Sequence, residues 1–426
     1  MTKEERKGFV GIVDAYSSGN YLAPEFKSRG WECVHIQSTP VIPAVAQSSF
    51  HSDDFAFHII HSDDVESTLV ECRRFNLTCV LVGCETGVEL ADKLSESLGL
   101  ATNGITLSTA RRDKFEMTQQ VASRGIRVIP SLKTNNSIEA LNWIVNQGWP
   151  IVLKPLRSAG TDSVISCNSL KEFQTAFNNV LGRHDQFGEL IDEVLIQKQI
   201  SGPEYIVDTV SRNGKHHVTN AWFIKKGIHN GHSFVCEYNE LLDYEKADKL
   251  GLIDYAFSVI DSLEIKHGPC HTEILMTADG PVLVEIASRL HGAGFPIYSR
   301  NCVGYSQVDL TVDSYIDHQA FDKKSRRTYE LSQKLVILEL ISKTEGVLQD
   351  LQYVEKIEKL PSFFKQKIDL KPGDCVEKTV DVFTSPGHVV LMHRDEAVIW
   401  RDYKQTRIFE DRGLYNVSTV IAREAG

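Results

Sequence analysis

The sequence predicts a multidomain protein of mixed α/β class, in which a small parallel-sheet domain precedes a central antiparallel sheet and an α+β tail. Residues 9–37 read as a buried strand, a short helix and a second strand, a unit typical of parallel sheets. Asn213-Gly214 lies between two runs of alternating polarity, which is a strong hairpin signal. The stretch 270–289, CHTEILMTADGPVLVEIASR, contains two further strand-like runs around a turn signal at 278–280.

The N-terminal α/β domain is expected to occupy residues 1–110. Its predicted elements are a strand over 9–14, a helix over 22–29, strands over 31–37 and 78–82, and a helix over 85–98. The loop after the first strand holds one glycine and not GxGxxG, which excludes a dinucleotide-binding fingerprint. A further helix over about 108–124 carries Lys114 and begins the next region.

Three more regions are expected, over residues 111–200, 201–330 and 331–426. The predicted elements of the first are strands over 151–155 and 163–166 around a loop of small residues, a helix from 168 or 169 to about 181, and a strand over 194–197. Those of the second are strands over 205–210 and 216–224, a helix over about 243–263, and the hairpin 270–289. The last region has several strand-like runs and reads as an α+β tail.

Composition and charge exclude several classes of partner. The 426 residues carry a net charge of −11 and no long cluster of Lys and Arg, which argues against binding to nucleic acid or to an anionic membrane. The longest apolar run, 335–338, is far too short to span a bilayer, and the N-terminus lacks the apolar region of a signal peptide. The nine scattered cysteines, without a CxxC pair, indicate free thiols and a cytoplasmic protein.

Two glutamates are predicted to face each other in the hairpin 270–289. If Asp279 is the middle of a three-residue loop, Thr277 lies opposite Pro281 and Glu273 lies opposite Glu285. Like charges directly opposed on neighbouring strands are destabilising, so such a pair requires a cation. Hard oxygen ligands in a site that also holds phosphates suit Mg²⁺.

Alternation along the two strands divides their side chains between two faces. The face of the glutamates holds His271, Glu273, Glu285, Ala287 and Arg289. The other face is nearly all apolar, is expected to be core, and holds Thr272, Ile274, Met276, Val282, Val284 and Ile286.

Features that suit a nucleotide precede the hairpin. Lys154 ends a predicted strand, and the loop 156–162 that follows could cover a triphosphate, because backbone N–H groups and a lysine head suit phosphate oxygens. The loop is not a Walker A motif, since GxxxxGK[ST] is absent. Glu204, after Ser-Gly-Pro, could accept a hydrogen bond from a ribose hydroxyl.

The order of these features resembles the ATP-grasp superfamily over about residues 1–330: a lysine, a second lysine with a loop, SGPEY, then two facing glutamates followed by an arginine. The resemblance implies a Rossmann-like N-terminal domain over 1–110, a lid over 111–200 and a catalytic subdomain over 201–330, with ATP bound between the lid and the C-terminal subdomain.

The resemblance assigns roles by position. Lys114 and Lys154 would hold phosphates, the loop 157–162 would close over them, and Glu204 would bind the ribose. The implied ATP-binding residues are Lys114, Lys154, Ser158, Gly160, Thr161, Gln197, Lys198, Gln199, Ile200 and Glu204. Glu273 and Glu285 would bind Mg²⁺ or Mn²⁺.

One departure narrows the resemblance. Most ATP-grasp enzymes have an asparagine ligand two residues after the second glutamate, where this sequence has Ala287. The pattern Glu285–x–Ala287–x–Arg289 with Gly292 resembles the bacterial L-amino acid ligases, which also carry a C-terminal extension like 331–426. A guanidinium fork suits a carboxylate, so Arg289 is expected to hold a substrate carboxylate, and Gly292 would allow close backbone approach.

Two further residues are candidates beside this pattern. Glu237 could replace the missing ligand, and His291 could contact metal or substrate.

The resemblance implies ATP-dependent ligation of amino acids through an acyl phosphate, with ATP and Mg²⁺ as cofactors. A homodimer is common among such relatives. One alternative is a carboxylase or carbamoyl-phosphate-type enzyme that uses bicarbonate, but the sequence has no biotinyl AMKM motif and lacks the asparagine. A second alternative is a non-catalytic ATP-binding module, which the presence of both lysines and both glutamates disfavours.

Overall fold

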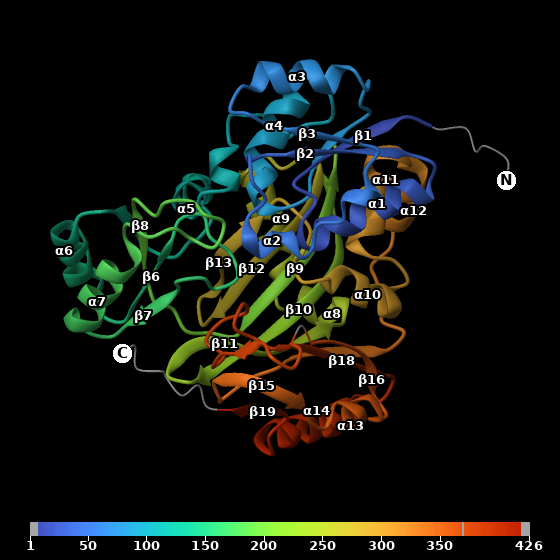
Figure 1. The fold of residues 1–426 in the computed structure, drawn as a ribbon. Coiled ribbons are helices and arrows are strands. Elements are labelled where there is room, and N and C mark those ends of the chain that lie inside the picture. The colour runs from blue at the N-terminus through green and yellow to red at the C-terminus, as the bar shows by residue number, and fades with distance from the viewer. Residues whose placement is uncertain (1–6, 369, 419–426) are drawn as a thin grey trace, which may run out of the picture. The chain divides into compact units, whose positions relative to one another are not determined.

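The computed structural model describes residues 7–368 and 370–418 (Figure 1). The chain divides into two compact units. The first unit comprises the described residues of Met1–Ala159, Ser163–Ala221 and Asp243–Glu330. The second comprises the described residues of Gly160–Asp162, Trp222–Leu242 and Leu331–Gly426. None of the helices in these described ranges combines the length and the apolar composition that crossing a membrane requires.

A four-stranded parallel sheet, in the order β3-β2-β1-β4, begins the first unit and confirms the predicted α/β class. Its strands and the helices around them are β1 Phe9–Val13, α1 Leu22–Ser28, β2 Glu32–Gln37, α2 Ala44–Gln47, β3 Phe57–Ile60, α3 Val65–Arg73, β4 Val80–Val82 and α4 Val88–Ser97. Strands β1 and β2 are almost wholly buried, because helices cover both faces of a parallel sheet.

A helix from far along the chain helps to bury this sheet. Val308 and Val312 of α11 (Gln307–Ile316) belong to the same apolar core as Val10 and Leu22, and α11 lies beside α1 (Figure 1). A segment predicted to belong to the region 201–330 therefore helps to bury the N-terminal sheet.

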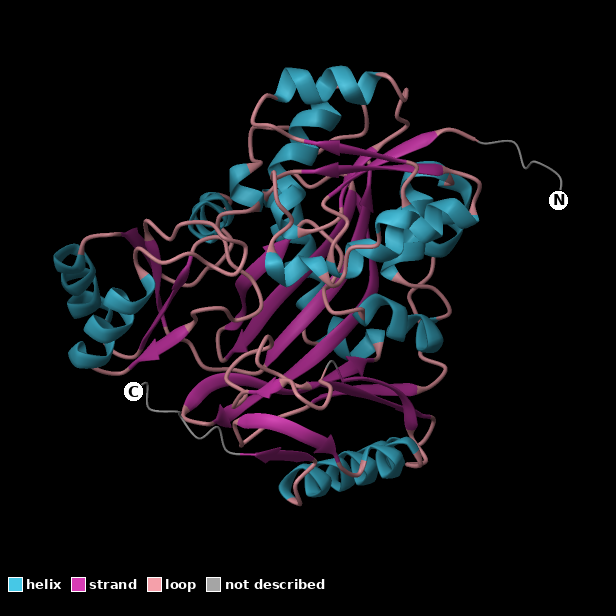
Figure 2. Cartoon of the chain, viewed as in Figure 1, coloured by secondary structure: helices cyan, strands magenta, loops and turns pink. Residues whose placement is uncertain are grey.

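The region 111–200, which was predicted to be a lid, contains an antiparallel sheet in the order β5-β8-β6-β7, called the lid sheet below. Its elements are β5 Ser131–Thr134, α6 Ser137–Gln147, β6 Ile151–Pro155, β7 Ile165–Cys167, α7 Leu170–Val180 and β8 Val194–Lys198. Figure 2 shows this sheet with its helices beside it. Apolar side chains of both helices form one core with those of β6 and β8. Lys154 and Gln197, two of the predicted ATP-binding residues, alternate with the core residues Leu153 and Ile196 and therefore lie on the opposite face of this sheet.

The central sheet of the first unit runs in the order β13-β12-β9-β10. Its strands and flanking helices are α5 Lys114–Ser123, β9 Glu204–Arg212, β10 Lys215–His229, α8 Tyr244–Lys249, α9 Leu252–Ser262, β12 Gly268–Thr277, β13 Gly280–Ala287, α10 Phe295–Val303, α11 and α12 His318–Ser325. The helix predicted over 243–263 is two helices, interrupted where Gly251 adopts a left-handed conformation with φ +69°. Strand β10 continues into the second unit at Trp222.

The predicted hairpin turn is wrong by one residue, but the predicted pairing of the glutamates is confirmed. Thr277 lies opposite Gly280 and not opposite Pro281, so the loop contains two residues. A β-bulge between Glu273 and Ile274 then restores the register, and Glu273 faces Glu285. A bulge adds one residue to one strand, and these often lie beside functional sites.

The second unit is the α+β tail that the sequence predicts, with the hairpin β10–β11 added to it. One sheet runs β10-β11-β14-β18-β16, and a smaller one runs β17-β15-β19. The elements after β10 are β11 His232–Leu242, β14 Lys334–Glu339, β15 Gly346–Leu351, α13 Val354–Glu358, β16 Phe363–Ile368, β17 Cys375–Val376, β18 Gly387–His393, α14 Glu396–Asp411 and β19 Tyr415–Ser418. An apolar core that includes Val336, Leu391 and Ile399 joins β14, β18 and α14.

Glu339 is buried in this second unit and should make its stability depend on pH. Burial raises the pKa of Glu339 to about 7, although Arg407 acts in the opposite direction. The unfolded chain loses this proton at lower pH than the folded chain, so stability falls as pH rises from about 4.5 to 7 and stays reduced above. Glu339→Gln should raise the free energy of unfolding at pH 8 by roughly 2–3 kcal/mol and change it little at pH 4.5.

Denaturant unfolding at the two pH values measures this effect. Glu345→Gln, at an exposed glutamate of the same unit, serves as the matched control and should show no comparable gain. Equal effects of Glu339→Gln at both pH values would contradict the assignment.

Candidate active site

Each of the two facing glutamates has a basic neighbour. The Lys114 Nζ lies 3.1 Å from Glu285 Oε1, and His271 Nε2 lies 3.2 Å from Glu273 Oε1. Both carboxylates are half-buried, with side chains that are 16% (Glu285) and 27% (Glu273) exposed. The two carboxylates therefore attract positively charged groups. Their oxygen atoms are hard ligands of the kind that Mg²⁺ prefers, so the pair fits that ion.

Lys114 reaches this pair because the helix predicted over 108–124 starts later than expected. Asp113 is the N-cap of α5 and accepts hydrogen bonds from the backbone of Phe115 and Glu116. Met117, one turn on, packs in the core beneath the hairpin and accepts a hydrogen bond from Ile286 N through its sulfur. Lys114 is consequently buried beside Glu285, rather than solvated on a polar face.

The loop after β6 is tied to the same lysine. Lys114 Nζ donates to the Ser158 carbonyl, and Lys114 N donates to the Leu156 carbonyl at 3.1 Å. Lys154, in β6, and Ser158 are both buried. The structure thus brings the start of the predicted phosphate-covering loop and one predicted metal ligand to a single lysine.

Four predicted ATP-binding residues, Gln197 to Ile200, lie at the end of β8 and directly beyond it. Gln197 pairs with Val152 in the lid sheet. Lys198 Nζ donates to the carbonyls of Gly148 and Trp149, at 3.0 and 3.1 Å, so its side chain holds the loop before β6. A structural role therefore accounts for the side chain of Lys198, and only its backbone remains a candidate for the nucleotide.

Three other predicted nucleotide-binding residues follow. Gln199 accepts a hydrogen bond from Ser166 Oγ at 2.6 Å, Ile200 leads out of the strand, and Glu204 is the first residue of β9. Gly202 between them is required by packing, because a Cβ there would lie 2.1 Å from the Met276 carbonyl oxygen. This close contact places the SGPE segment directly on β12.

Gly160 and Thr161 both adopt left-handed backbone conformations, with φ of +66° and +63°. A Cβ at Gly160 would lie 2.5 Å from Phe383 Cε2 and 2.8 Å from Val382 Cγ1. The neighbours of Gly160 in the structure are thus two apolar side chains of the second unit, Val382 and Phe383. Close approach of Gly160 to a phosphate remains a prediction.

Replacing Gly160 tests whether this loop acts in nucleotide binding. Gly160→Val should raise the KM for ATP by about ten- to a hundredfold, because a left-handed β-branched residue and the clash with Phe383 would displace the loop from the conformation predicted to cover the phosphates, at a cost of a few kcal/mol. Steady-state kinetics with varied ATP measures the effect. Gly188→Val is the matched control, since Gly188 has φ +85° but open space around it. Equal KM values for ATP in both variants would show that the loop is an ordinary turn.

Arg289 is paired with a buried carboxylate, Glu85, that was not among the predicted site residues. Its Nε donates to Glu85 Oε2 at 2.8 Å, and its Nη1 donates to the Leu290 carbonyl at 2.7 Å. Arg112 Nη1 lies 3.8 Å from Glu85 Oε1. Burial raises the pKa of Glu85, but Arg289, Arg112 and Lys114 outweigh burial, and the net pKa is lowered. Glu85 stays ionised and orients the guanidinium.

The loop after Arg289 contacts the loop that follows β1. Ala293 N donates to Ser17 Oγ at 3.4 Å, and Gly294 N donates to Ser18 Oγ at 3.0 Å. These two serines therefore bind backbone N–H groups of the segment that was expected to approach the substrate. A Cβ at Gly292 would make only ordinary contact with Ser17 Oγ, at 3.7 Å, so packing within the chain does not require this glycine.

His291 belongs to a buried cluster with Asp208 and His271. Asp208 Oδ1 lies 3.0 Å from His271 Nδ1, and Asp208 Oδ2 lies 2.8 Å from His291 Nδ1. Burial lowers the pKa of His271, but hydrogen bonds to Asp208 and Glu273 outweigh this effect and raise it to about 9. Burial likewise raises the pKa of Asp208, but the two histidines outweigh it and lower the pKa to about 2.

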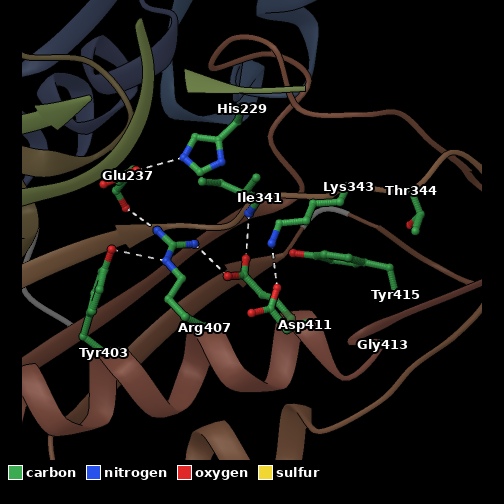
Figure 3. Close-up of a pocket in the computed structure, with 11 residues that line it drawn as sticks. His229, Glu237, Ile341, Lys343, Thr344, Tyr403, Arg407, Asp411, Gly413 and Tyr415 are labelled. Carbon is green, nitrogen blue, oxygen red and sulfur yellow. Dashed lines mark hydrogen bonds and ion pairs between the residues drawn. The ribbon is translucent and has the colours of Figure 1, made fainter. Parts of the chain in front are cut away.

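Glu237 lies in the second unit, where it lines a pocket of about 260 Å³ (Figure 3). Glu237 Oε1 is 2.9 Å from His229 Nε2, and its backbone carbonyl accepts a hydrogen bond from Arg407 at 2.6 Å. The other lining residues also come from this unit. Glu237 already has a partner there, and its role as a replacement metal ligand remains a prediction.

Two buried acids of the first unit, Glu85 and Asp208, were missed. Glu85 follows the carboxyl end of β4, and in parallel sheets ligands bind outside these strand ends. Asp208 interrupts the apolar run of β9 and is 1% exposed, and a buried carboxylate must be paired. Both signals can be read from a sequence once the strands are assigned.

Comparison with known proteins identifies the family of this chain. Residues 147–296 match the ATP-grasp domain family. The chain is 32% identical to dapdiamide A synthase of Enterobacter agglomerans over 418 residues, which are 96% of this chain and 97% of that one. It is 22% identical to an L-arginine-specific L-amino acid ligase of Bacillus subtilis, over 76% of this chain and 79% of that one.

A solved structure has the same fold. The L-amino acid ligase from Bacillus licheniformis superimposes with a TM-score of 0.71 at 16% identity, covering 98% of this chain and all of that one. The chain belongs to the ATP-grasp superfamily, in its L-amino acid ligase branch. It is therefore an ATP-grasp ligase, as the order of motifs in its sequence predicts.

Proposed function

We propose that this ligase joins two amino acids, or an amino acid and a similar small carboxylate or amine, through an acyl phosphate, with release of ADP and phosphate. The observation that carries the proposal is the grouping of Glu273, Glu285 and Lys114, with Arg289 two residues beyond the end of the strand that holds Glu285. A phosphate-transfer site and a carboxylate-binding group then belong to one hairpin.

The residues of the site suit the first step, in which a carboxylate attacks the γ-phosphate of ATP. Lys114 and Lys154 supply fixed positive charge in a buried environment, where it is effective against the negative charge on a transferring phosphoryl group. Glu273 and Glu285 would hold Mg²⁺, which neutralises charge on the phosphates when bound.

Arg289 suits another task of the site, which is to position an amino acid by its carboxylate. Its guanidinium is oriented by Glu85, so its planar fork is preorganised for a carboxylate. The amine of the second substrate attacks the acyl carbon, phosphate leaves, and an amide bond remains. The loop 157–162 would keep water from the acyl phosphate, which would otherwise hydrolyse.

A panel assay tests the reaction. Purified protein is incubated with Mg-ATP and the twenty amino acids singly and in pairs; phosphate release is measured, and products are identified by mass. The proposal expects release that depends on amino acids and a product equal in mass to two amino acids less one water. Stimulation by bicarbonate and by no amino acid would contradict it and favour the carboxylase alternative.

A further inference from the structure

Asp208 connects β12, which holds the predicted metal ligand Glu273, with the loop 289–294, called the substrate loop below. One of its oxygens, Oδ1, binds His271 Nδ1, and the other ring nitrogen of His271 reaches the predicted metal ligand Glu273 at 3.2 Å. Its second oxygen, Oδ2, binds His291 Nδ1 at 2.8 Å, and His291 lies between Arg289 and Gly292. A single carboxylate therefore contacts both parts of the candidate site through one histidine each.

The connection is rigid on both sides. Asp208 is 1% exposed and lies in β9, which is paired with β12 from Glu204 to Ser211. The ring of His291 is stacked on Phe295, with centroids 4.3 Å apart, and lies 4.1 Å from the ring of His271. Buried side chains with satisfied hydrogen bonds have few alternative rotamers, so a shift of one part is resisted by the other.

Gln307 makes a second connection between the same elements. Its side-chain oxygen accepts a hydrogen bond from His291 N at 2.9 Å. Its Nε2 donates to the carbonyls of Thr209, in β9, and Cys270, in β12, at 3.1 and 2.9 Å. Gln307 thus links the backbone of the substrate loop to β9, which contains Asp208, and to the neighbouring strand β12.

A metal ion bound by Asp208, His271 and His291 is the competing interpretation, since the three offer ligand atoms within 4.8 Å of one another. His271, however, lies between two carboxylates, those of Asp208 and Glu273. Both ring nitrogens must donate to satisfy both acids, and an imidazole that donates from both nitrogens has no lone pair for a metal. The geometry therefore favours a hydrogen-bonded connection.

We propose that Asp208 is a positioning residue that holds the Glu273 carboxylate and the loop 289–294 in register, so that a divalent cation and a substrate carboxylate strengthen each other's binding. The inference rests on the proposed function for its substrate side. Such coupling is reciprocal, and values of about 5- to 150-fold are typical. Partners that orient metal ligands typically change metal affinity by about 10- to 100-fold when they are removed.

Binding of Mn²⁺ to the full-length protein with ADP, followed by electron paramagnetic resonance, tests the metal side without turnover. Asp208→Asn should weaken Mn²⁺ binding about tenfold. Asp92→Asn is the matched control, because Asp92 is also a buried acid of the first unit but binds Ser108 and Arg111. It should leave Mn²⁺ binding unchanged, and an equal loss in both variants would overturn the proposal.

Two further variants test separately the connection through His271 and the connection through His291. They also replace Asp208→Asn if that variant does not fold. His271→Asn can keep the contact with Asp208 but not that with Glu273, and should weaken Mn²⁺ binding. His291→Gln loses the contact of Nδ1 with Asp208, and should leave Mn²⁺ affinity in the absence of amino acid near that of the unmodified protein. If His271→Asn binds Mn²⁺ as the unmodified protein does, the connection does not position Glu273 and the proposal fails.

The coupling is measured by repeating the Mn²⁺ titration with the amino acid that most stimulates ADP formation. The unmodified protein should bind Mn²⁺ more tightly with the amino acid, and Asp208→Asn and His291→Gln should lose most of that gain. An undiminished gain in both would overturn the proposal, as would stoichiometric zinc in the purified protein that Asp208→Asn lacks. If no amino acid stimulates turnover, the proposed function fails, while the Mn²⁺ titrations still decide the role of Asp208.

Discussion

Glu285→Gln is expected to abolish ligation while the protein remains folded. The change removes one charged ligand of the predicted metal pair and leaves a side chain of nearly the same shape. The loss of several kcal/mol of charge stabilisation in phosphoryl transfer corresponds to at least about a hundred- to a thousandfold in kcat. Glu273→Gln should have a similar effect, because the two residues face each other on adjacent strands.

The structure changes what these variants should do to stability. The sequence suggested repulsion between two uncompensated carboxylates, which either substitution would relieve. Lys114 and His271 already lie beside them, so each substitution removes one favourable contact. The melting temperature should therefore stay equal or fall slightly.

Phosphate release and thermal unfolding, with and without Mg-ATP, measure the two effects. Glu264→Gln is the matched control, since Glu264 is an exposed acid of the same unit that contacts Arg124 at 3.5 Å. Near-normal turnover of Glu285→Gln or Glu273→Gln would show that the pair is not the metal site.

Arg289→Ala is expected to damage amino acid use far more than ATP use. Losing one partner of a desolvated charged pair costs about 3–5 kcal/mol, equivalent to roughly a hundred- to several-thousandfold in apparent binding. The KM for the amino acid should rise, or kcat/KM should fall, by an amount in this range, while the KM for ATP changes little. Arg289→Lys should recover little, because an ammonium cannot match the planar fork.

Glu85 requires a control in this experiment. Arg289→Ala leaves a buried carboxylate with Arg112 as a more distant partner, so part of any loss reflects structure. The double variant Arg289→Ala/Glu85→Gln removes that unpaired charge. If the double variant regains both the melting temperature and amino acid use, Arg289 is structural and the substrate assignment is wrong.

The main elements could be predicted because periodicity and turn residues along the chain determine them. The buried β1 and β2, the Asn213-Gly214 hairpin and the hairpin 270–289 are all present. The glutamate pair was predicted correctly although the turn was not, because the bulge at Glu273 offsets the shorter loop. Bulges leave no clear signal in an alternating sequence, so the turn error could not have been avoided by counting residues.

Contacts between distant segments could not be predicted in the same way. Arg289 and Glu85 are 204 positions apart, and their pairing depends on how β13 meets the end of β4. The place of Lys114 beside Glu285 likewise follows from a helix start set by Asp113 and from the packing of Met117. These arrangements come from tertiary packing, whereas periodicity and turn residues report only on neighbours along the chain.

The transfer of oxygen from the carboxylate to phosphate tests the acyl-phosphate proposal most directly. The amino acid that serves as carboxylate substrate is labelled with heavy oxygen in its carboxyl group and is incubated with the protein, Mg-ATP and the amine substrate. Attack of this carboxylate on the γ-phosphate, followed by departure of phosphate from the acyl carbon, must leave one heavy oxygen in the released phosphate. The proposal predicts one labelled oxygen per phosphate formed and none in ADP; unlabelled phosphate, or label in AMP, would contradict it.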